Sequence, residues 1–191
     1  MSHIETPVDY HFPWYVRLFL ANQRRRYGRE LEPARLWGRT PWVFAGLSLL
    51  YGALDRRSSP IEPALRTLVT VRVSQINWCA FCVDINSSTA LKRGLTEAQL
   101  EQLPRFEESQ LFDERTRSAL AYAEAVTYSE RQVDRPLMAR LKKYFNDEAI
   151  IELTAVIAFQ NLSSKFNAAL DVPAQGFCQM PSRFDTNAKL P

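Results

Sequence analysis

Hydrophobic residues recur along most of this chain with the period of an α-helix. Between residues 65 and 76, for example, apolar side chains fall at i, i+3, i+4, i+8 and i+11, which places them on one face of a helix. The strict apolar–polar alternation that is typical of strands is scarce. We therefore predict an all-α fold.

Prolines and glycines mark the ends of the first predicted helices. Pro13 suits the first turn of a helix that runs to about residue 26 and ends before Gly28. Pro41 suits the same place in a second helix, through the apolar run 42–54. Residues 59–62 have the spacing of a capping box, although Pro63 can move the true start of the third helix a turn later.

Short polar residues predict where the later helices start. Asn77 is expected to cap a helix that carries Cys79 and Cys82 and ends at Gly94. Residues 96–99 repeat the capping-box pattern and begin a short helix that ends at Pro104. Further helices are expected at 113–128, 135–145 and 146–170, so the prediction is a bundle of about seven helices.

The chain length favours one domain. With 191 residues and 46% apolar residues, the chain can bury a core without disulfide staples. We expect residues 1–58 to form an N-terminal helical layer, residues 59–172 to form the core of the domain, and residues 173–191 to be an irregular tail.

Charge and hydropathy limit the partners that we expect. The net charge of +3 is too small to indicate nucleic-acid binding. The longest apolar run, 42–54, is shorter than the ~20 residues that a membrane-spanning helix needs. The first ten residues are polar and acidic, unlike a secretory signal, so we expect a cytoplasmic protein.

The chemistry of the sequence centres on Cys79 and Cys82. Residues three apart on a helix share a face, so the two sulfur atoms can approach disulfide distance. The start of a helix also favours a thiolate, which is the nucleophile in disulfide exchange and in peroxide reduction. The pair is therefore able to cycle between dithiol and disulfide.

Two other interpretations of the pair stay open at this point. The cysteines can be small buried hydrophobic residues, which is a common place for free cysteine. They can also be part of a zinc site, but zinc needs about four ligands. Besides the pair, His3 and His11 are the only histidines and Cys178 is the only cysteine, and no second CxxC exists, so we expect no metal and no organic cofactor.

Residues 65–94, LRTLVTVRVSQINWCAFCVDINSSTALKRG, resemble the core motif of the carboxymuconolactone decarboxylase superfamily, which includes alkylhydroperoxidase D. That motif reads like RELVxLxVSxxNxCxYCxxxHxxxAxxxG. The resemblance implies an all-α alkylhydroperoxidase D-like bundle that assembles as a homo-oligomer, usually a trimer or hexamer. It also implies that Cys82 attacks a peroxide, that Cys79 resolves the product, and that a protein or small thiol donates electrons.

The chain departs from the motif at two positions. Peroxidase members carry a Glu twelve residues before the first cysteine and a His four residues after the second, and here these positions are Thr67 and Asn86. Neither side chain can take up a proton near neutral pH. Two nearby acids fit poorly as replacements, because Asp84 lies off the cysteine face by helical spacing and Glu62 lies more than a turn before Thr67. The core also lacks histidine, so we expect no lactone decarboxylase activity.

The last predicted helix carries a second polar group of residues, which circles the helix rather than following one face. Some of these side chains are expected to face the cysteine pocket or a subunit interface, and Lys165 would then help to stabilise a thiolate. The members of the group are Gln160, Asn161, Ser163, Ser164, Lys165 and Asn167.

From the sequence we expect a thiol-disulfide redox enzyme of the peroxidase-related kind, with Cys82 and Cys79 as catalytic residues and Asn86, Thr67 and Lys165 in support. The alternative is a non-catalytic or ligand-binding member of the family whose cysteine pair is structural. The absent Glu and His favour that alternative.

Overall fold

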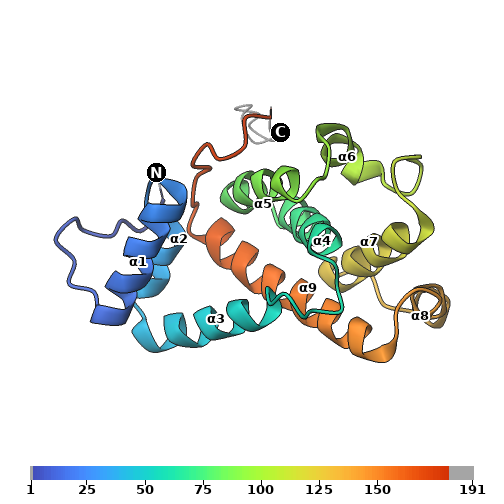
Figure 1. Cartoon of the computed structure of the whole chain (residues 1–191), viewed down its shortest axis with the longest axis horizontal. Helices are drawn as coiled ribbons and strands as arrows, with labels where there is room; N and C mark the ends of the chain where they lie inside the picture. The colour runs from blue at the N-terminus through green and yellow to red at the C-terminus, as the bar shows by residue number, and fades with distance from the viewer. Residues whose placement is uncertain (1, 181–191) are drawn as a thin grey trace.

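The computed structural model describes residues 2–180, and in this range the chain is entirely helical (Figure 1). The all-α prediction is confirmed. The described part contains nine α-helices and one 3₁₀ helix rather than about seven helices. They are α1 (Trp14–Tyr27), α2 (Glu32–Gly38), α3 (Pro41–Leu54), α4 (Pro63–Ile76), α5 (Ala80–Lys92), α6 (Glu97–Gln102), η1 (Leu103–Arg105), α7 (Glu114–Thr127), α8 (Arg135–Lys142) and α9 (Asp147–Ala169).

The helix missing from the prediction is α2, a seven-residue segment between the first two predicted helices. Pro33 stands in its first turn, where the missing N–H costs nothing. A segment this short carries too few apolar positions to show a helical period.

The predicted helix starts are mostly correct. Thr96 and Gln99 form the capping box, and the Asn146 side chain accepts the N–H of Ala149 at the start of α9. The box predicted at 59–62 is wrong, because α4 begins at Pro63 without a side-chain cap. The Ser59 hydroxyl instead accepts the N–H of Ile61 and bonds Glu152 of α9.

Helix α4 lies at the centre of the molecule and packs against α5, α7 and α9 (Figure 1). Its buried face meets α7 and α9 in the larger hydrophobic core, to which Leu68, Val71, Leu120, Leu153 and Ile157 contribute. Most of the side chains in α4 are buried because neighbouring helices cover it on several sides.

A second, smaller core joins the N-terminal helices to α5 and α9. Val16, Leu20 and Phe44 pack in this cluster together with Cys79 and Cys82. Trp37 of α2 stacks on Phe166 of α9, with ring centroids 3.5 Å apart. The N-terminal layer therefore covers the region of the cysteine pair.

The segment after α9 returns to the surface of α5. The buried carboxylate of Asp84 accepts the backbone N–H groups of Gln175 and Cys178, at 2.8 and 2.7 Å. Residues 173–180 form no helix or strand, and the rest of the predicted tail lies outside the described residues. In the range that the structure covers, no helix is long and apolar enough to cross a membrane.

Candidate active site

The cysteine pair lies at the junction of α4 and α5. Helix α4 ends at Ile76, and Trp78 takes a left-handed backbone conformation with φ of 54° that turns the chain into α5. Asn77 is therefore the C-cap of α4, and its predicted role as the N-cap of the cysteine helix is wrong. Cys79 is the N-cap instead, and its sulfur accepts the N–H of Cys82 at 3.2 Å.

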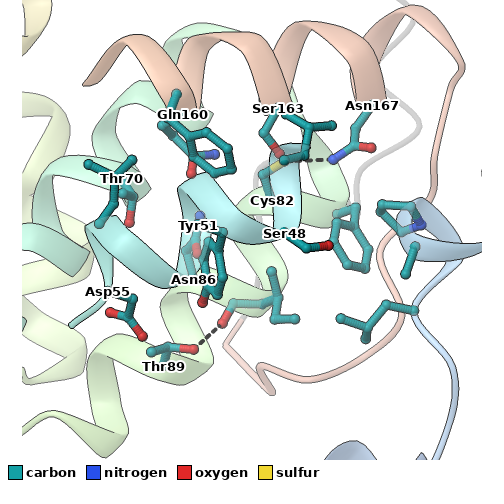
Figure 2. A pocket seen from close by; sticks show the side chains of 18 of the residues that line it. Ser48, Tyr51, Asp55, Thr70, Cys82, Asn86, Thr89, Gln160, Ser163 and Asn167 are labelled. Atoms are coloured by element: carbon teal, nitrogen blue, oxygen red, sulfur yellow. Dashed lines mark hydrogen bonds between the residues drawn. The ribbon is translucent and has the colours of Figure 1, made fainter. Parts of the chain in front are cut away.

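The two sulfur atoms lie at disulfide-bonding distance, with the Cα atoms 5.2 Å apart. Both side chains are buried, and Cys82, unlike Cys79, lines a cavity. The Nδ2 group of Asn167 in α9 donates to the Cys82 sulfur at 3.2 Å (Figure 2). The outer sulfur thus faces a space that a ligand can enter, and the inner sulfur lies behind it.

The polar group on α9 divides between several environments. Gln160, Ser163 and Asn167 line the cavity, which confirms that part of the group faces the cysteines. Gln160 donates to the hydroxyls of Ser74 and Ser164, in a buried network that Asn86 joins through Ser74.

Two members of this group lie elsewhere. Asn161 accepts from Asn77 and donates to Thr127, so it ties α9 to the end of α4 and to α7. Lys165 is exposed and does not line the cavity. The structure does not bring Lys165 to the cysteines.

The cavity has a volume of about 330 Å³ and lies between the N-terminal layer and the helices α4, α5 and α9. This volume is at the lower end of the range for small-molecule sites, roughly 300–1,000 Å³. Its walls are largely apolar and include seven aromatic rings. The rings that line it belong to Phe19, Tyr27, Trp37, Phe44, Tyr51, Phe81 and Phe159.

Thr67 and Asn86 both line this cavity, although neither carries the acid or base of the family motif. The Thr67 hydroxyl donates to the carbonyl of Pro63 and accepts from Nη1 of Arg93, both at 2.7 Å. Asn86 donates to the Ser74 hydroxyl at 3.3 Å. Both positions still carry polar side chains. Their hydrogen bonds join neutral groups and a guanidinium, however, and do not form a proton relay.

Neither acid that the sequence offers near the cysteines, Asp84 or Glu62, replaces the relay. Asp84 is occupied by the backbone of the C-terminal segment, and Glu62 is exposed beside Arg115. Tyr51 of α3 is the cavity residue with a shifted pKa. Although 51% of the residue is exposed, desolvation of its phenol inside the cavity, followed by the charge of Asp55, raises the pKa of that phenol, so the hydroxyl stays protonated near neutral pH.

The sequence pattern did not single out Tyr51, Asp55, Arg66 or Arg93 as parts of the site. All four line the cavity. Arg66 and Arg93 lie inside the matched motif, but only the folded chain shows that both pair with Asp55 at the end of α3 and share a cavity with Cys82. Among the described residues, no group of three or more His, Cys, Asp or Glu side chains is arranged to hold a metal ion.

Comparison with known proteins identifies the family. A model of the carboxymuconolactone decarboxylase family matches residues 41–125, which begin at the first residue of α3. The uncharacterized protein YnjA of Escherichia coli K12 is 43% identical over 160 residues, which cover 84% of this chain and 88% of YnjA.

Two solved structures are similar in fold. An alkylhydroperoxidase AhpD core protein from Ralstonia eutropha JMP134, described as an uncharacterized peroxidase-related protein, aligns with a TM-score of 0.82 over 92% of this chain and 94% of that chain, at 19% identity. The debrominase Bmp8 aligns with a TM-score of 0.75 over 86% of this chain and 88% of its own, at 22% identity. At these identities the likeness establishes the fold alone. The matched segment, the similarity to YnjA and the shared fold show that this chain belongs to the carboxymuconolactone decarboxylase family and has the AhpD-like fold.

Proposed function

We propose that the chain is a thiol-dependent reductase of organic hydroperoxides, in which Cys82 attacks and Cys79 resolves. The main support is the position of the two sulfur atoms. Cys82 lines the cavity and accepts a hydrogen bond from Asn167, and Cys79 lies behind it within bonding reach. A cavity of about 330 Å³ with aromatic walls also favours an organic substrate over hydrogen peroxide.

The reaction needs two electrons from the cysteine pair. The Cys82 thiolate attacks the terminal oxygen of R–O–OH, the O–O bond breaks, and Cys82 becomes a sulfenic acid while the alkoxide takes a proton and leaves as alcohol. The Cys79 thiol then attacks the Cys82 sulfur, which releases water and forms the disulfide. An external dithiol, from a protein or a small thiol, reduces the disulfide and is itself oxidised.

The alkoxide needs a proton donor, and Tyr51 fits this role. Its phenol lines the cavity and remains protonated because burial and Asp55 raise its pKa. In Figure 2, Tyr51 lies between Cys82 and Asp55. Without the Glu and His of the motif, we expect turnover below that of members that carry both.

The aromatic walls also favour a second substrate class, an aromatic bromide. The debrominase Bmp8 shares the fold, and a variant of it is known in complex with 2,3,4-tribromopyrrole. In such a reaction the two thiols supply two electrons, the C–Br bond is replaced by C–H, and bromide leaves as the disulfide forms. If instead the cysteine pair is structural, neither class of substrate is consumed.

Variant kinetics test the proposed function. The reduced chain should consume cumene hydroperoxide with dithiothreitol as donor, and Cys82→Ser should abolish this consumption. Cys79→Ser should complete one turnover and leave Cys82 as a sulfenic acid that dimedone traps. Cys178→Ser, which removes the free cysteine beside Asp84, is the matched control and should keep full activity. Consumption that survives in Cys82→Ser would refute the proposal.

A further inference from the structure

The end of the cavity away from the cysteines carries an excess of positive charge. Among the described residues that line the cavity, the cationic side chains are Arg26, Arg66 and Arg93, and the anionic side chain is Asp55. The three arginines come from different helices or their ends, so the charge excess depends on tertiary packing and is not visible as a run in the sequence.

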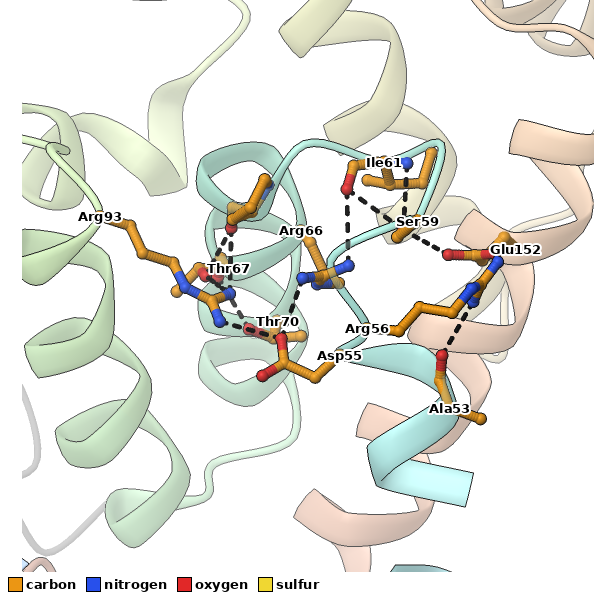
Figure 3. A network of polar contacts seen from close by, with 11 residues as sticks. Ala53, Asp55, Arg56, Ser59, Ile61, Arg66, Thr67, Thr70, Arg93 and Glu152 are labelled. Carbon is orange, nitrogen blue, oxygen red and sulfur yellow. Dashed lines mark hydrogen bonds and ion pairs between the residues drawn. The ribbon is translucent and has the colours of Figure 1, made fainter. Parts of the chain in front are cut away.

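Asp55 is shared between two guanidinium groups (Figure 3). Its Oδ1 atom accepts Nη2 of Arg93 at 2.9 Å and Nη2 of Arg66 at 3.0 Å. The other contacts of Arg93 are to neutral oxygens, the Thr67 hydroxyl and the carbonyl of Pro63. Asp55 is thus the carboxylate that pairs directly with both guanidinium groups, whereas Glu152, which lies near enough to interact electrostatically with Arg66, forms its ion pair with Arg56.

Arg66 is 5% exposed, and among the described residues its Nε atom has no hydrogen-bond partner. A buried guanidinium without full charge compensation is unfavourable, because its hydration is lost. An anion in the adjacent cavity would supply the missing negative charge, and guanidinium groups bind carboxylates strongly through paired hydrogen bonds.

The charged cluster and the sulfur lie at different ends of one cavity. Figure 2 shows Cys82 and Asn167 at one end and Asp55 and Thr89 at the other, with Tyr51 and Asn86 between them. The aromatic side chains form the walls around this space. A ligand that fills the cavity thus meets a polar cationic end, an apolar middle and the reactive sulfur.

We propose that the substrate is an amphipathic organic acid, whose carboxylate binds Arg93 and Arg66 while its reducible group lies at Cys82. This inference rests on the proposed function for the chemistry at Cys82, but the anion site is defined by Asp55, Arg66 and Arg93 alone. Arg93 is the more accessible of the two guanidinium groups and makes the first contact with the carboxylate.

A binding experiment separates the anion site from turnover. The probes are 4-isopropylbenzoate and its neutral analogue 4-isopropylbenzamide, and tryptophan fluorescence of the intact chain reports binding because Trp37 lines the cavity. The acid should bind at least tenfold more tightly than the amide, since hydrogen bonds between two charged groups are stronger than those to a neutral amide. Added salt should weaken binding of the acid only.

Substitutions test the residues. Arg93→Gln should lose roughly tenfold in affinity for the acid and leave the amide unchanged, and Arg93→Lys should restore part of the loss. Asp55→Asn should increase the affinity for the acid, because it removes the carboxylate that competes for the two guanidinium groups. Arg140→Gln, at the surface ion pairs with Glu107 and Glu114, is the matched control and should bind as the unchanged chain does. Thermal melting checks that each variant is folded. If a variant does not fold, the difference in affinity between acid and amide, measured on the unchanged chain, still tests the anion site.

Equal binding of acid and amide, or no binding of the acid at millimolar concentration, would overturn the inference. The proposed function is tested separately with cumene hydroperoxide and its para-carboxylate derivative. A chain that binds the acid but consumes neither hydroperoxide refutes the redox function and leaves the anion site standing. Consumption of both hydroperoxides at equal kcat/KM refutes the anion site and leaves the redox function standing.

Discussion

Asn167 is the residue that most directly connects the cysteine pair with the helix that faces it. Its Nδ2 group donates to the Cys82 sulfur, and within the described part of the chain its buried Oδ1 atom has no hydrogen-bond partner. A donor on sulfur stabilises a thiolate relative to a thiol, since the negative charge strengthens the hydrogen bond. The carboxamide therefore favours the reactive form of Cys82 and holds it towards the cavity.

We predict that Asn167→Ala slows the alkylation of Cys82 by iodoacetamide in the reduced chain by about tenfold at neutral pH, because a hydrogen bond to a charged group is worth about 1.5–3 kcal/mol. Ser163→Ala, in the same helix and the same cavity, is the control and should react at the unchanged rate. An unchanged rate in Asn167→Ala would mean that this hydrogen bond does not stabilise the thiolate.

A second prediction concerns the two positions where the family motif carries Glu and His. The double change Thr67→Glu with Asn86→His should raise peroxide consumption by tenfold or more, because a positioned base contributes about 10²–10⁴-fold. Both positions line the cavity, so the new groups can reach a bound substrate. No gain in a folded variant would indicate that the cavity serves another chemistry.

The motif was sufficient to identify the cysteines and the two positions that replace the relay, because all four lie within one short stretch of α4 and α5. It could not assign Asn167 to Cys82, since 85 residues separate them and only the packing of α9 brings them together. Lys165, two residues away, was predicted to support the same thiolate and is exposed instead, because the six polar residues circle the helix.

At the scale of elements, Gly38 fixes how α2 packs against α1. A Cβ atom at this position would lie 2.8 Å from Cγ1 of Val16 and 2.9 Å from the ring of Phe12. Contacts this short require the neighbours to move, and both neighbours belong to the small core of the N-terminal layer.

We expect Gly38→Ala to lower the free energy of unfolding by about 1–3 kcal/mol, the usual cost of overpacking. Gly46→Ala is the control, because nothing lies within 4 Å of a Cβ atom there and the position is inside a helix. It should raise the free energy of unfolding by up to about 1 kcal/mol. Urea denaturation measures both, and equal stability of the two variants would contradict the packing described for α2.

Helix boundaries were predictable where a capping residue acts within its own segment, as Thr96 and Asn146 do. The start of α5 was not, because the turn before it uses Trp78 at positive φ, a conformation that is rare for a bulky residue. Asn77 has the right chemistry for an N-cap, but α4 extends far enough to use it as a C-cap.

For the molecule as a whole, α3 is a strongly apolar helix that its own chain leaves largely uncovered. Of its fourteen residues only Phe44 and Leu54 are buried, although most of its side chains are apolar. Trp42 is 89% exposed and Leu49 is 77% exposed. Several rings of the N-terminal layer, Phe12, Tyr15, Phe19, Trp37 and Phe44, pack inside the chain. Among the helices of this layer, the exposed large apolar side chains belong to α3 and to Trp14 and Leu18 of α1.

We propose that a second copy of this chain covers α3, because large exposed apolar patches mark interaction surfaces and tryptophan is favoured at their centres. Light scattering should give a mass that is a multiple of 22.0 kDa at micromolar concentration. Trp42→Glu with Leu49→Glu should reduce it to that of one chain, whereas Glu substitutions at the exposed Lys142 and Lys143, at the end of α8, should not. A monomer in the unchanged chain would refute the proposal.

The helical period of the apolar residues was sufficient to predict the fold class. It could not predict the cavity, because side chains from six helices form it and the period does not indicate how those helices are arranged in space. The same limit applies to the exposed face of α3. Its continuous apolar run predicts burial, and the sequence does not indicate whether the covering surface belongs to the same chain or to another.

The central claim is that Cys79 and Cys82 form a reversible disulfide, and peptide mass spectrometry of the intact chain tests it most directly. After mild peroxide treatment, the peptide that contains both cysteines should lose about two hydrogens and resist alkylation, and dithiothreitol should restore both thiols. Cys178 should remain open to alkylation throughout. If Cys79 and Cys82 both alkylate freely after peroxide treatment, the pair is not a redox centre.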